Sequence, residues 1–142
     1  MNKYQELKKK HQEDINNFPM FFAFNKEQFA EGMRKLGLEP DNADAIYKLG
    51  NTGGYFRKTD DQAFCDMMER HDAEMKAAID ADTTGDGFIY EMFNYELSNH
   101  EYCYTGDLTD TLHALALTED EINASDTLQH GLITSVKERK RK

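Results

Sequence analysis

Apolar residues recur at steps of three and four along most of the chain, the spacing that places side chains on one face of an α-helix. The pattern predicts a first helix that ends near Asn17, a second that begins after Asn25, and a long third helix between Thr59 and the Gly85-Asp86-Gly87 turn. Four shorter helices are expected after that turn. Their apolar or capping positions are Ile89, Met92, Phe93, Leu97 and His100, then Leu108, Leu112 and Leu115, then Thr118 with Glu121, and last Leu128, Leu132 and Val136.

Polar pairs three residues apart mark where three of these helices begin. In a capping box, the first side chain accepts a backbone N–H of the opening turn, and a Glu or Gln three positions later reaches back. The pairs are Asn25 with Gln28, Thr59 with Gln62, and Thr118 with Glu121. Gly37 lies where the second helix needs a left-handed residue at its end. Short-range signals therefore predict most helix boundaries.

Three short segments are expected to be strands. The run Met20–Phe24 is too short and too uniformly apolar for a surface helix, so we interpret it as a buried strand. Residues 45–49 and 55–58 flank the glycine-rich run 50–54, whose glycines can adopt the positive φ values that reverse a chain. These two segments predict a β-hairpin.

The expected fold class is α+β, a mostly helical single domain with a small three-stranded antiparallel sheet. A length of 142 residues is typical of one domain, and nine Phe, seven Tyr and seven Met, with no Trp, supply an aromatic core. The segment 137–142 has no apolar residue to bury. We therefore expect a domain over residues 1–136, followed by a basic disordered tail over residues 137–142.

The charge is distributed unevenly along the chain. The net charge is −10, yet both ends are basic, so the body carries more negative charge than the total suggests. Such a body repels nucleic acid phosphates and attracts basic surfaces, so we expect no direct nucleic acid partner. The alternative is that acidity only keeps the protein soluble.

Neither a secretion signal nor a membrane span is expected. Residues 1–10 are polar and rich in lysine, and the longest apolar run is only Met20–Phe24. Cys65 and Cys103 have no neighbour at metal-ligand spacing, which indicates free thiols in a reducing compartment. These features favour a cytoplasmic location, with no membrane partner.

The segment Asp80–Glu91 resembles an EF-hand calcium loop between two predicted helices. The candidate oxygen ligands are Asp80, Asp82, Thr84, Asp86 and Glu91. A register that starts at Asp80 has Gly87 where a branched apolar residue belongs, and one that starts at Asp82 has Phe93 in place of the bidentate Glu. We therefore expect an Asp/Gly turn that binds calcium weakly if at all. A calcium- or small-ligand-binding module stays as the alternative function.

The sequence offers little for catalysis. His100 and Cys103 are three residues apart, as a thiolate nucleophile and its base require, but no third polar group orients them. The five histidines lack the HExxH or paired CxxC spacing of zinc sites, and the run 50–54 lacks the Lys of a phosphate loop. We expect no catalytic residue and no cofactor, and a protein that is not an enzyme. An enzyme whose catalytic groups the sequence does not single out stays open as an alternative.

Aromatic residues are frequent in the region that follows the Asp/Gly turn. They are Tyr90, Phe93, Tyr95, Tyr102 and Tyr104. Such side chains complete a core more often than they form a stacking surface, and the surrounding carboxylates argue against a nucleic acid strand. A small nucleotide held by a few convergent groups stays open.

Four segments carry a family resemblance: residues 18–24, 27–33, 54–58 and 87–102. In their order and composition the chain is similar to a family of short uncharacterised proteins carried by bacteriophages and mobile elements of Gram-positive bacteria. The resemblance covers about residues 4–132 and implies no catalytic residue. It implies a context in which small acidic proteins often occupy a basic surface on a host defence protein, as anti-CRISPR and anti-restriction inhibitors do.

This context favours a non-enzymatic inhibitor located in the cytoplasm of the bacterial host. The expected partner is a basic surface on a host protein, such as a nucleic-acid-binding nuclease. The candidate partner-binding residues are the acidic positions on the outer face of the third helix, namely Asp60, Asp61, Asp66, Glu69, Asp72 and Glu74. The alternative is that these residues form only a solvated helix face.

Overall fold

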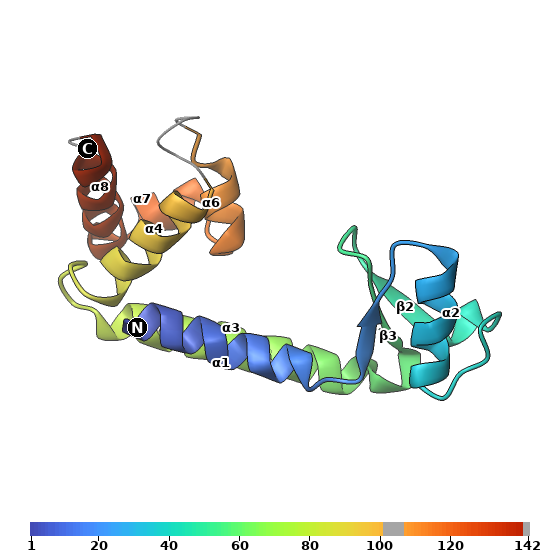
Figure 1. Cartoon of the computed structure of the whole chain (residues 1–142). Helices are drawn as coiled ribbons and strands as arrows, with labels where there is room; N and C mark the ends of the chain where they lie inside the picture. The colour runs from blue at the N-terminus through green and yellow to red at the C-terminus, as the bar shows by residue number, and fades with distance from the viewer. Residues whose placement is uncertain (101–106, 141–142) are drawn as a thin grey trace. The chain divides into compact units, whose positions relative to one another are not determined.

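The computed structural model of the protein describes residues 1–100 and 107–140 (Figure 1). In chain order the elements are α1 (Lys3–Asn16), β1 (Met20–Phe22), α2 (Lys26–Lys35), η1 (Ala43–Ala45), β2 (Ile46–Leu49), β3 (Gly54–Arg57), η2 (Lys58–Asp60), α3 (Asp61–Ala81), α4 (Phe88–Asn99), α6 (Thr109–Ala114), α7 (Glu119–Asn123) and α8 (Asp126–Lys140). The fold class predicted from the sequence, mostly helical α+β with a small three-stranded antiparallel sheet, is confirmed.

The chain contains two compact units. One consists of residues 1–10 and 73–142, and the other of residues 11–72, so that the boundary falls within α1 and within α3. Within the part of the chain that the structure describes, no helix has the length and apolar character needed to cross a membrane. The expectation that residues 1–136 form one domain stays a prediction.

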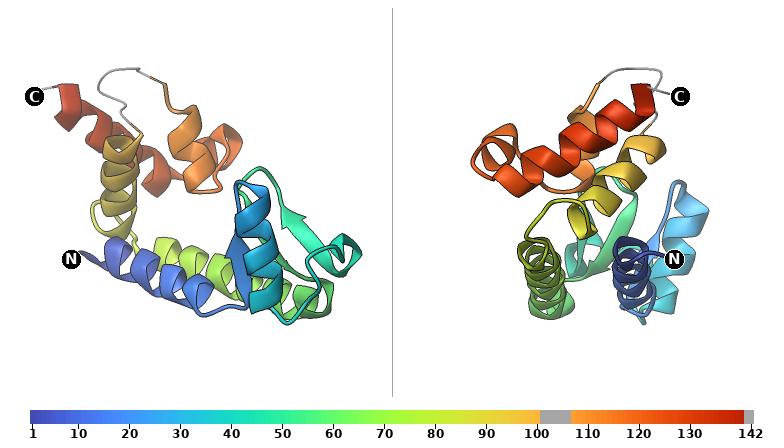
Figure 2. Two further views of the ribbon diagram at one scale, coloured as in Figure 1. Left: turned by 45° about the vertical axis from the view of Figure 1, so that its right-hand side comes forward. Right: turned by 90° about the vertical axis from the view of Figure 1, so that its left-hand side faces the viewer.

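The sheet lies in the unit of residues 11–72 and has the strand order β1-β3-β2. The predicted hairpin is present as β2 and β3, with Tyr47 opposite Phe56, and β1 adds on the other side with Phe21 opposite Tyr55. Helix α2 packs on one face of this sheet (Figure 2). Phe21 and Met33 are buried in this contact. Gly32 permits this contact, because a Cβ at that position would overlap the Phe21 ring.

The opposite face of the sheet is covered in part by aromatic rings from the same unit. The Phe56 ring stacks on Phe64 of α3 at a centroid distance of 4.5 Å, and Phe18 meets Phe64 edge to face at 5.6 Å. Such pairs add to the free energy that area burial supplies. The N-terminal part of α3 is thereby fixed against the sheet.

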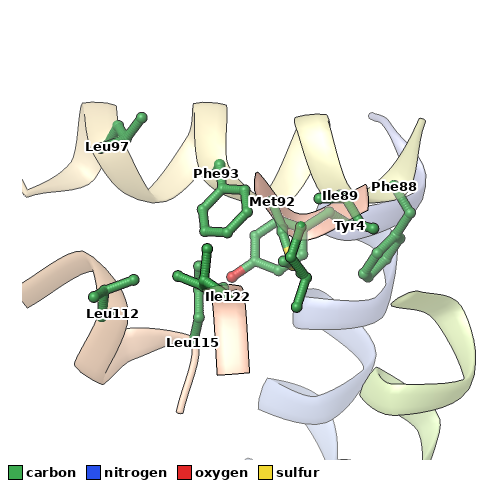
Figure 3. Close-up of a cluster of buried hydrophobic side chains, with 10 residues drawn as sticks. Tyr4, Phe88, Ile89, Met92, Phe93, Leu97, Leu112, Leu115 and Ile122 are labelled. Atoms are coloured by element: carbon green, nitrogen blue, oxygen red, sulfur yellow. The ribbon is translucent and has the colours of Figure 1, made fainter. Parts of the chain in front are cut away.

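The core of the unit that contains residues 1–10 and 73–142 centres on α4 (Figure 3). Its inner face carries Ile89, Met92, Phe93 and Leu97, all fully buried, at the spacing predicted from the sequence. Buried side chains from the other elements of this unit pack against it, namely Tyr4 of α1, Leu112 of α6, Leu115 directly after α6, Ile122 of α7 and Leu128 of α8. Helix α8 approaches α4 closely at Gly131, where a Cβ would lie 2.5 Å from Ile89 Cγ2.

Helix starts agree with two of the three capping predictions. Asn25 caps α2 by accepting the Gln28 N–H at 2.8 Å, and Thr118 forms a complete capping box with Glu121. The Thr59 prediction is wrong, because Thr59 lies in η2 and α3 begins at Asp61. The Gln62 side chain donates to Asp66 at 2.9 Å.

The C-terminal helix is longer than expected. Residues 137–142 were predicted to be disordered, but α8 continues to Lys140. Lys, Glu and Arg are good helix formers, so their propensity extends a helix that packing has already formed. Arg141 and Lys142 lie outside the described residues.

Candidate functional site

The six acidic residues predicted to bind a partner differ in their surroundings. Asp66, Glu69 and Asp72 are exposed on α3. Two others are paired with a cation: Asp60 accepts from Arg57 Nε at 2.7 Å, and Glu74 accepts from Lys10 Nζ at 3.0 Å. Glu74 belongs to the other compact unit. The structure therefore groups five of the six in the unit of residues 11–72, and leaves Asp66, Glu69 and Asp72 as the most exposed.

The acidic residues of α3 create a negative potential around an exposed cysteine. The Cys65 Sγ lies 3.9 Å from Asp61 Oδ1. Local desolvation, followed by the carboxylates of Asp61, Glu69 and Asp66, raises the pKa of the Cys65 thiol. The thiol therefore stays protonated and unreactive at neutral pH. We refer to Asp61, Cys65, Asp66, Glu69 and Asp72 as the α3 acidic face.

Exposed aromatic side chains occur in the same unit. Phe22 is 50% exposed, Phe24 is 78% exposed and Tyr47 is 44% exposed. Met20 and Tyr47 both lie opposite Phe56, so their side chains are on the same face of the sheet. Phe22 is two residues from Met20 on the same strand and therefore also belongs to this face. We expected Met20–Phe24 to be a buried strand, which is wrong for Phe22 and Phe24. A uniformly apolar run has no alternation of apolar and polar residues, so the sequence does not indicate which side chains are exposed.

Two histidines in this unit join α1 to α3. The His11 and His71 rings stack at a centroid distance of 3.9 Å. Asp14 Oδ2 lies 2.9 Å from His71 Nε2 and accepts from Arg70 at 3.0 Å. The hydrogen bond with His71, and then that with Arg70, lowers the pKa of the Asp14 carboxyl. This arrangement is best explained as a structural contact within residues 11–72.

The Asp82 carboxylate of the calcium-loop candidate is occupied by backbone amides. Its Oδ1 accepts from Thr84 N at 3.2 Å and Gly85 N at 2.9 Å, and its Oδ2 accepts from Gly87 N at 3.1 Å and Ile89 N at 3.0 Å. Partial burial raises the pKa of this carboxyl, but the amides of Ile89, Gly85 and Thr84 outweigh it, so that the pKa of Asp82 is lowered. Asp82 therefore closes the turn and caps the start of α4.

The other proposed calcium ligands are not brought together. Asp80 is exposed at the end of α3, and Asp86 Oδ1 lies 2.7 Å from His130 Nε2 of α8. Thr84 Oγ1 hydrogen-bonds within the turn, and Glu91 lies on α4. Among residues 1–100 and 107–140, no group of three or more His, Cys, Asp or Glu side chains is placed to hold a metal ion. The geometry is that of a capped Asp/Gly turn.

Replacing Asp82 with asparagine is expected to lower the free energy of unfolding by about 1–2 kcal/mol at pH 7, because an NH₂ group would then face two backbone N–H groups. Since the pKa of Asp82 lies below its ordinary value of 3.8, its stabilisation is present above that value and is lost as the pH falls through the lowered pKa. Urea unfolding of both proteins at pH 7 and at pH 3 measures this. The difference between them should shrink at pH 3, and an equal difference at both values would contradict the assignment.

A buried ionic cluster surrounds Glu96 of α4, and sequence reasoning missed it. The Glu96 side chain is fully buried, and its Oε1 accepts from Lys8 Nζ at 2.6 Å and from the Tyr4 hydroxyl at 3.1 Å. Burial, and then the Glu96 carboxylate, raises the pKa of Tyr4, which keeps the hydroxyl protonated as a donor. The Lys8 ammonium also lies 4.8 Å from the centroid of the Tyr95 ring. The apolar spacing of α4 indicated that position 96 lies near the core. The neighbouring sequence did not indicate that Tyr4 and Lys8 of α1 would be its partners.

His100 borders the same cluster. Its Nε2 lies 3.5 Å from Glu96 Oε2, and neither atom makes a hydrogen bond to a described residue. Tyr95, one of the aromatic residues considered for stacking, instead packs against Tyr4 at a centroid distance of 5.6 Å. Cys103, the proposed partner of His100 for thiol chemistry, lies outside the described residues, as do Tyr102 and Tyr104.

Comparison with known proteins yields one finding. The sequence matches the family described as "Family of unknown function (DUF7659)" over residues 3–138. No curated protein and no solved structure matches the chain. Because the matched segment covers nearly the whole sequence, the protein belongs to the DUF7659 family of unknown function.

Proposed function

We propose that the protein acts by non-enzymatic binding to a basic surface on a host protein, as an inhibitor that a phage or mobile element carries. The partner class is a nucleic-acid-binding nuclease of host defence, since such enzymes present basic surfaces to DNA or RNA. The observation that carries the proposal is the α3 acidic face, where the carboxylates of Asp66, Glu69 and Asp72 are exposed on one helix. A surface of this kind steers a basic partner into contact.

The unit of residues 11–72 combines this charge with apolar anchors. It contains twelve Asp and Glu against seven Lys and Arg. It also exposes Phe22, Phe24 and Tyr47. Protein interfaces obtain most of their affinity from a few aromatic anchors, whereas surrounding charges set the association rate and the choice of partner. This unit supplies both kinds of group.

Replacing Asp66, Glu69 and Asp72 with Asn, Gln and Asn should leave the fold intact and slow association with the partner by about tenfold or more. The substitutions keep side-chain shape and remove three exposed charges. The partner would be captured from a lysate of the bacterial host and its kinetics measured by biolayer interferometry from 0.05 to 0.5 M salt. The wild-type association rate should fall steeply with salt, because the screening length drops from about 14 Å to about 4 Å over this range.

A matched control removes the same number of charges elsewhere in the unit. Glu27, Glu31 and Glu39 are exposed in or after α2, and their triple replacement with Gln should change the association rate much less. The functional readout is the plating efficiency of a phage on a restricting or CRISPR-immune host. Wild-type protein should raise it and the α3 variant should not. Binding that is indifferent to salt and to the α3 substitutions, or immunity that the wild-type protein leaves unchanged, would refute the proposal.

A further inference from the structure

The unit that contains residues 1–10 and 73–142 has a pocket of about 670 Å³, where α1, the C-terminal half of α3 and the start of α4 meet. Pockets that bind small molecules are typically about 300–1,000 Å³ in volume. The apolar part of the wall comes from Leu7, three alanines of α3 and Phe88. The alanines Ala77, Ala78 and Ala81 leave this space open, because their side chains end at Cβ.

Glu91 lines the pocket, and one of its carboxylate oxygens lacks a hydrogen-bond partner among the described residues. This oxygen, Oε2, is buried. The other two lining carboxylates are engaged: Asp82 accepts the backbone amides of the Asp/Gly turn, and Glu74 accepts from Lys10. A buried acceptor without a donor is unfavourable, and more so when it is charged. A donor that enters the pocket would relieve this penalty at Glu91.

The charges of the residues that line the pocket favour a positively charged donor. Three of the described lining residues are carboxylates, and Lys3 is the one cation among them. The amides of Gly87 and Ile89 at the start of α4 donate to Asp82, so they do not offer a site to an anion. A charged donor gives a stronger hydrogen bond to a carboxylate than a neutral one does.

We propose that this pocket binds a small molecule that consists of an apolar body and one ammonium group, with Glu91 as the acceptor. The apolar body lies against Leu7, Phe88 and the alanines of α3, and the ammonium group donates to the Glu91 carboxylate. This site belongs to residues 1–10 and 73–142, and it is independent of the α3 acidic face in the other unit.

The test uses three probes that differ in one group: 4-phenylbutylammonium, 4-phenylbutanol and 4-phenylbutyrate. Titration of ¹⁵N-labelled full-length protein should give saturable shifts at residues 77–91 with the ammonium probe. The alcohol should bind at least about tenfold more weakly, because a hydroxyl gives the Glu91 carboxylate a weaker hydrogen bond than an ammonium group does. The carboxylate probe should bind more weakly still, because it has no donor and carries the same charge as Glu91. The Glu91→Gln variant should lose about tenfold or more in affinity for the ammonium probe alone.

Two further variants distinguish the site from general electrostatics and from misfolding. Asp80 is exposed on α3 and does not line the pocket, so Asp80→Asn makes the same change in net charge and should leave binding unchanged. Ala81→Leu places a larger side chain in the pocket from an exposed helix position and should weaken all probes. The proposal is wrong if no probe binds, if the three probes bind equally, or if Glu91→Gln behaves as Asp80→Asn does in folded protein.

Discussion

Replacement of Gly85 with alanine is expected to lower the free energy of unfolding by about 3 kcal/mol. Gly85 has φ +86°, a left-handed value at which an L side chain is strained. A Cβ at this position would also overlap the carbonyl oxygen of Thr127 in α8. A backbone atom cannot move aside as the end of a side chain can, so either the turn or α8 must shift. Urea unfolding followed by circular dichroism measures the loss.

Gly37 provides the control for this experiment. It also has a left-handed φ, of +76°, but a Cβ there would have no neighbour within 4 Å. Gly37→Ala should therefore reduce stability only by the backbone strain, about 1 kcal/mol. The difference between the two variants isolates the contact of the turn with α8. If Gly85→Ala lost no more stability than Gly37→Ala, that contact would not exist in solution.

Replacement of Glu96 with alanine should lower the free energy of unfolding by about 3–5 kcal/mol. The substitution leaves a cavity beside α4 and removes the acceptor of the Tyr4 hydroxyl, which is buried. It also removes the partner of Lys8, but the Lys8 side chain is 44% exposed and can return to water. Most of the loss therefore comes from the cavity and from the Tyr4 hydroxyl. Chemical unfolding at pH 7 gives the value.

Two milder variants divide this loss into its parts. Glu96→Gln keeps the shape and an acceptor for Tyr4, so it should reduce stability by about 1–2 kcal/mol, and Tyr4→Phe should reduce it by about 1 kcal/mol. In the double variant Glu96→Ala with Tyr4→Phe, the combined loss should be smaller than the sum of the single losses, because the hydroxyl is no longer left without an acceptor. A loss below about 1 kcal/mol for Glu96→Ala would show that the carboxylate is not buried as described.

Much of the local structure follows from short-range signals that the sequence contains. Asn25 and Thr118 cap α2 and α7, because a side-chain oxygen near the first turn satisfies orphan amides wherever the helix lies in the fold. Gly50 and Gly53 adopt the positive φ values that reverse the chain between β2 and β3. The apolar spacing of α4 predicted its buried face, with Phe93 and Leu97. These preferences act over a few residues and need no partner from elsewhere.

The tertiary structure alone determined which polar groups are buried and which aromatic ones are exposed. Glu96 is buried because Tyr4 and Lys8, 92 and 88 residues away, reach it from α1. Phe22 remains exposed because α2 covers only the other face of the sheet. The uniformly apolar run Met20–Phe24 does not indicate which of its side chains lie on the covered face. The calcium-loop pattern forms a cap because the backbone amides of Ile89, Gly85 and Thr84 donate to Asp82, and they outweigh its partial burial and lower the pKa of this carboxyl. Composition and spacing specify which groups are available, but the desolvation and pairing of each group depend on distant segments that only the folded chain brings into contact.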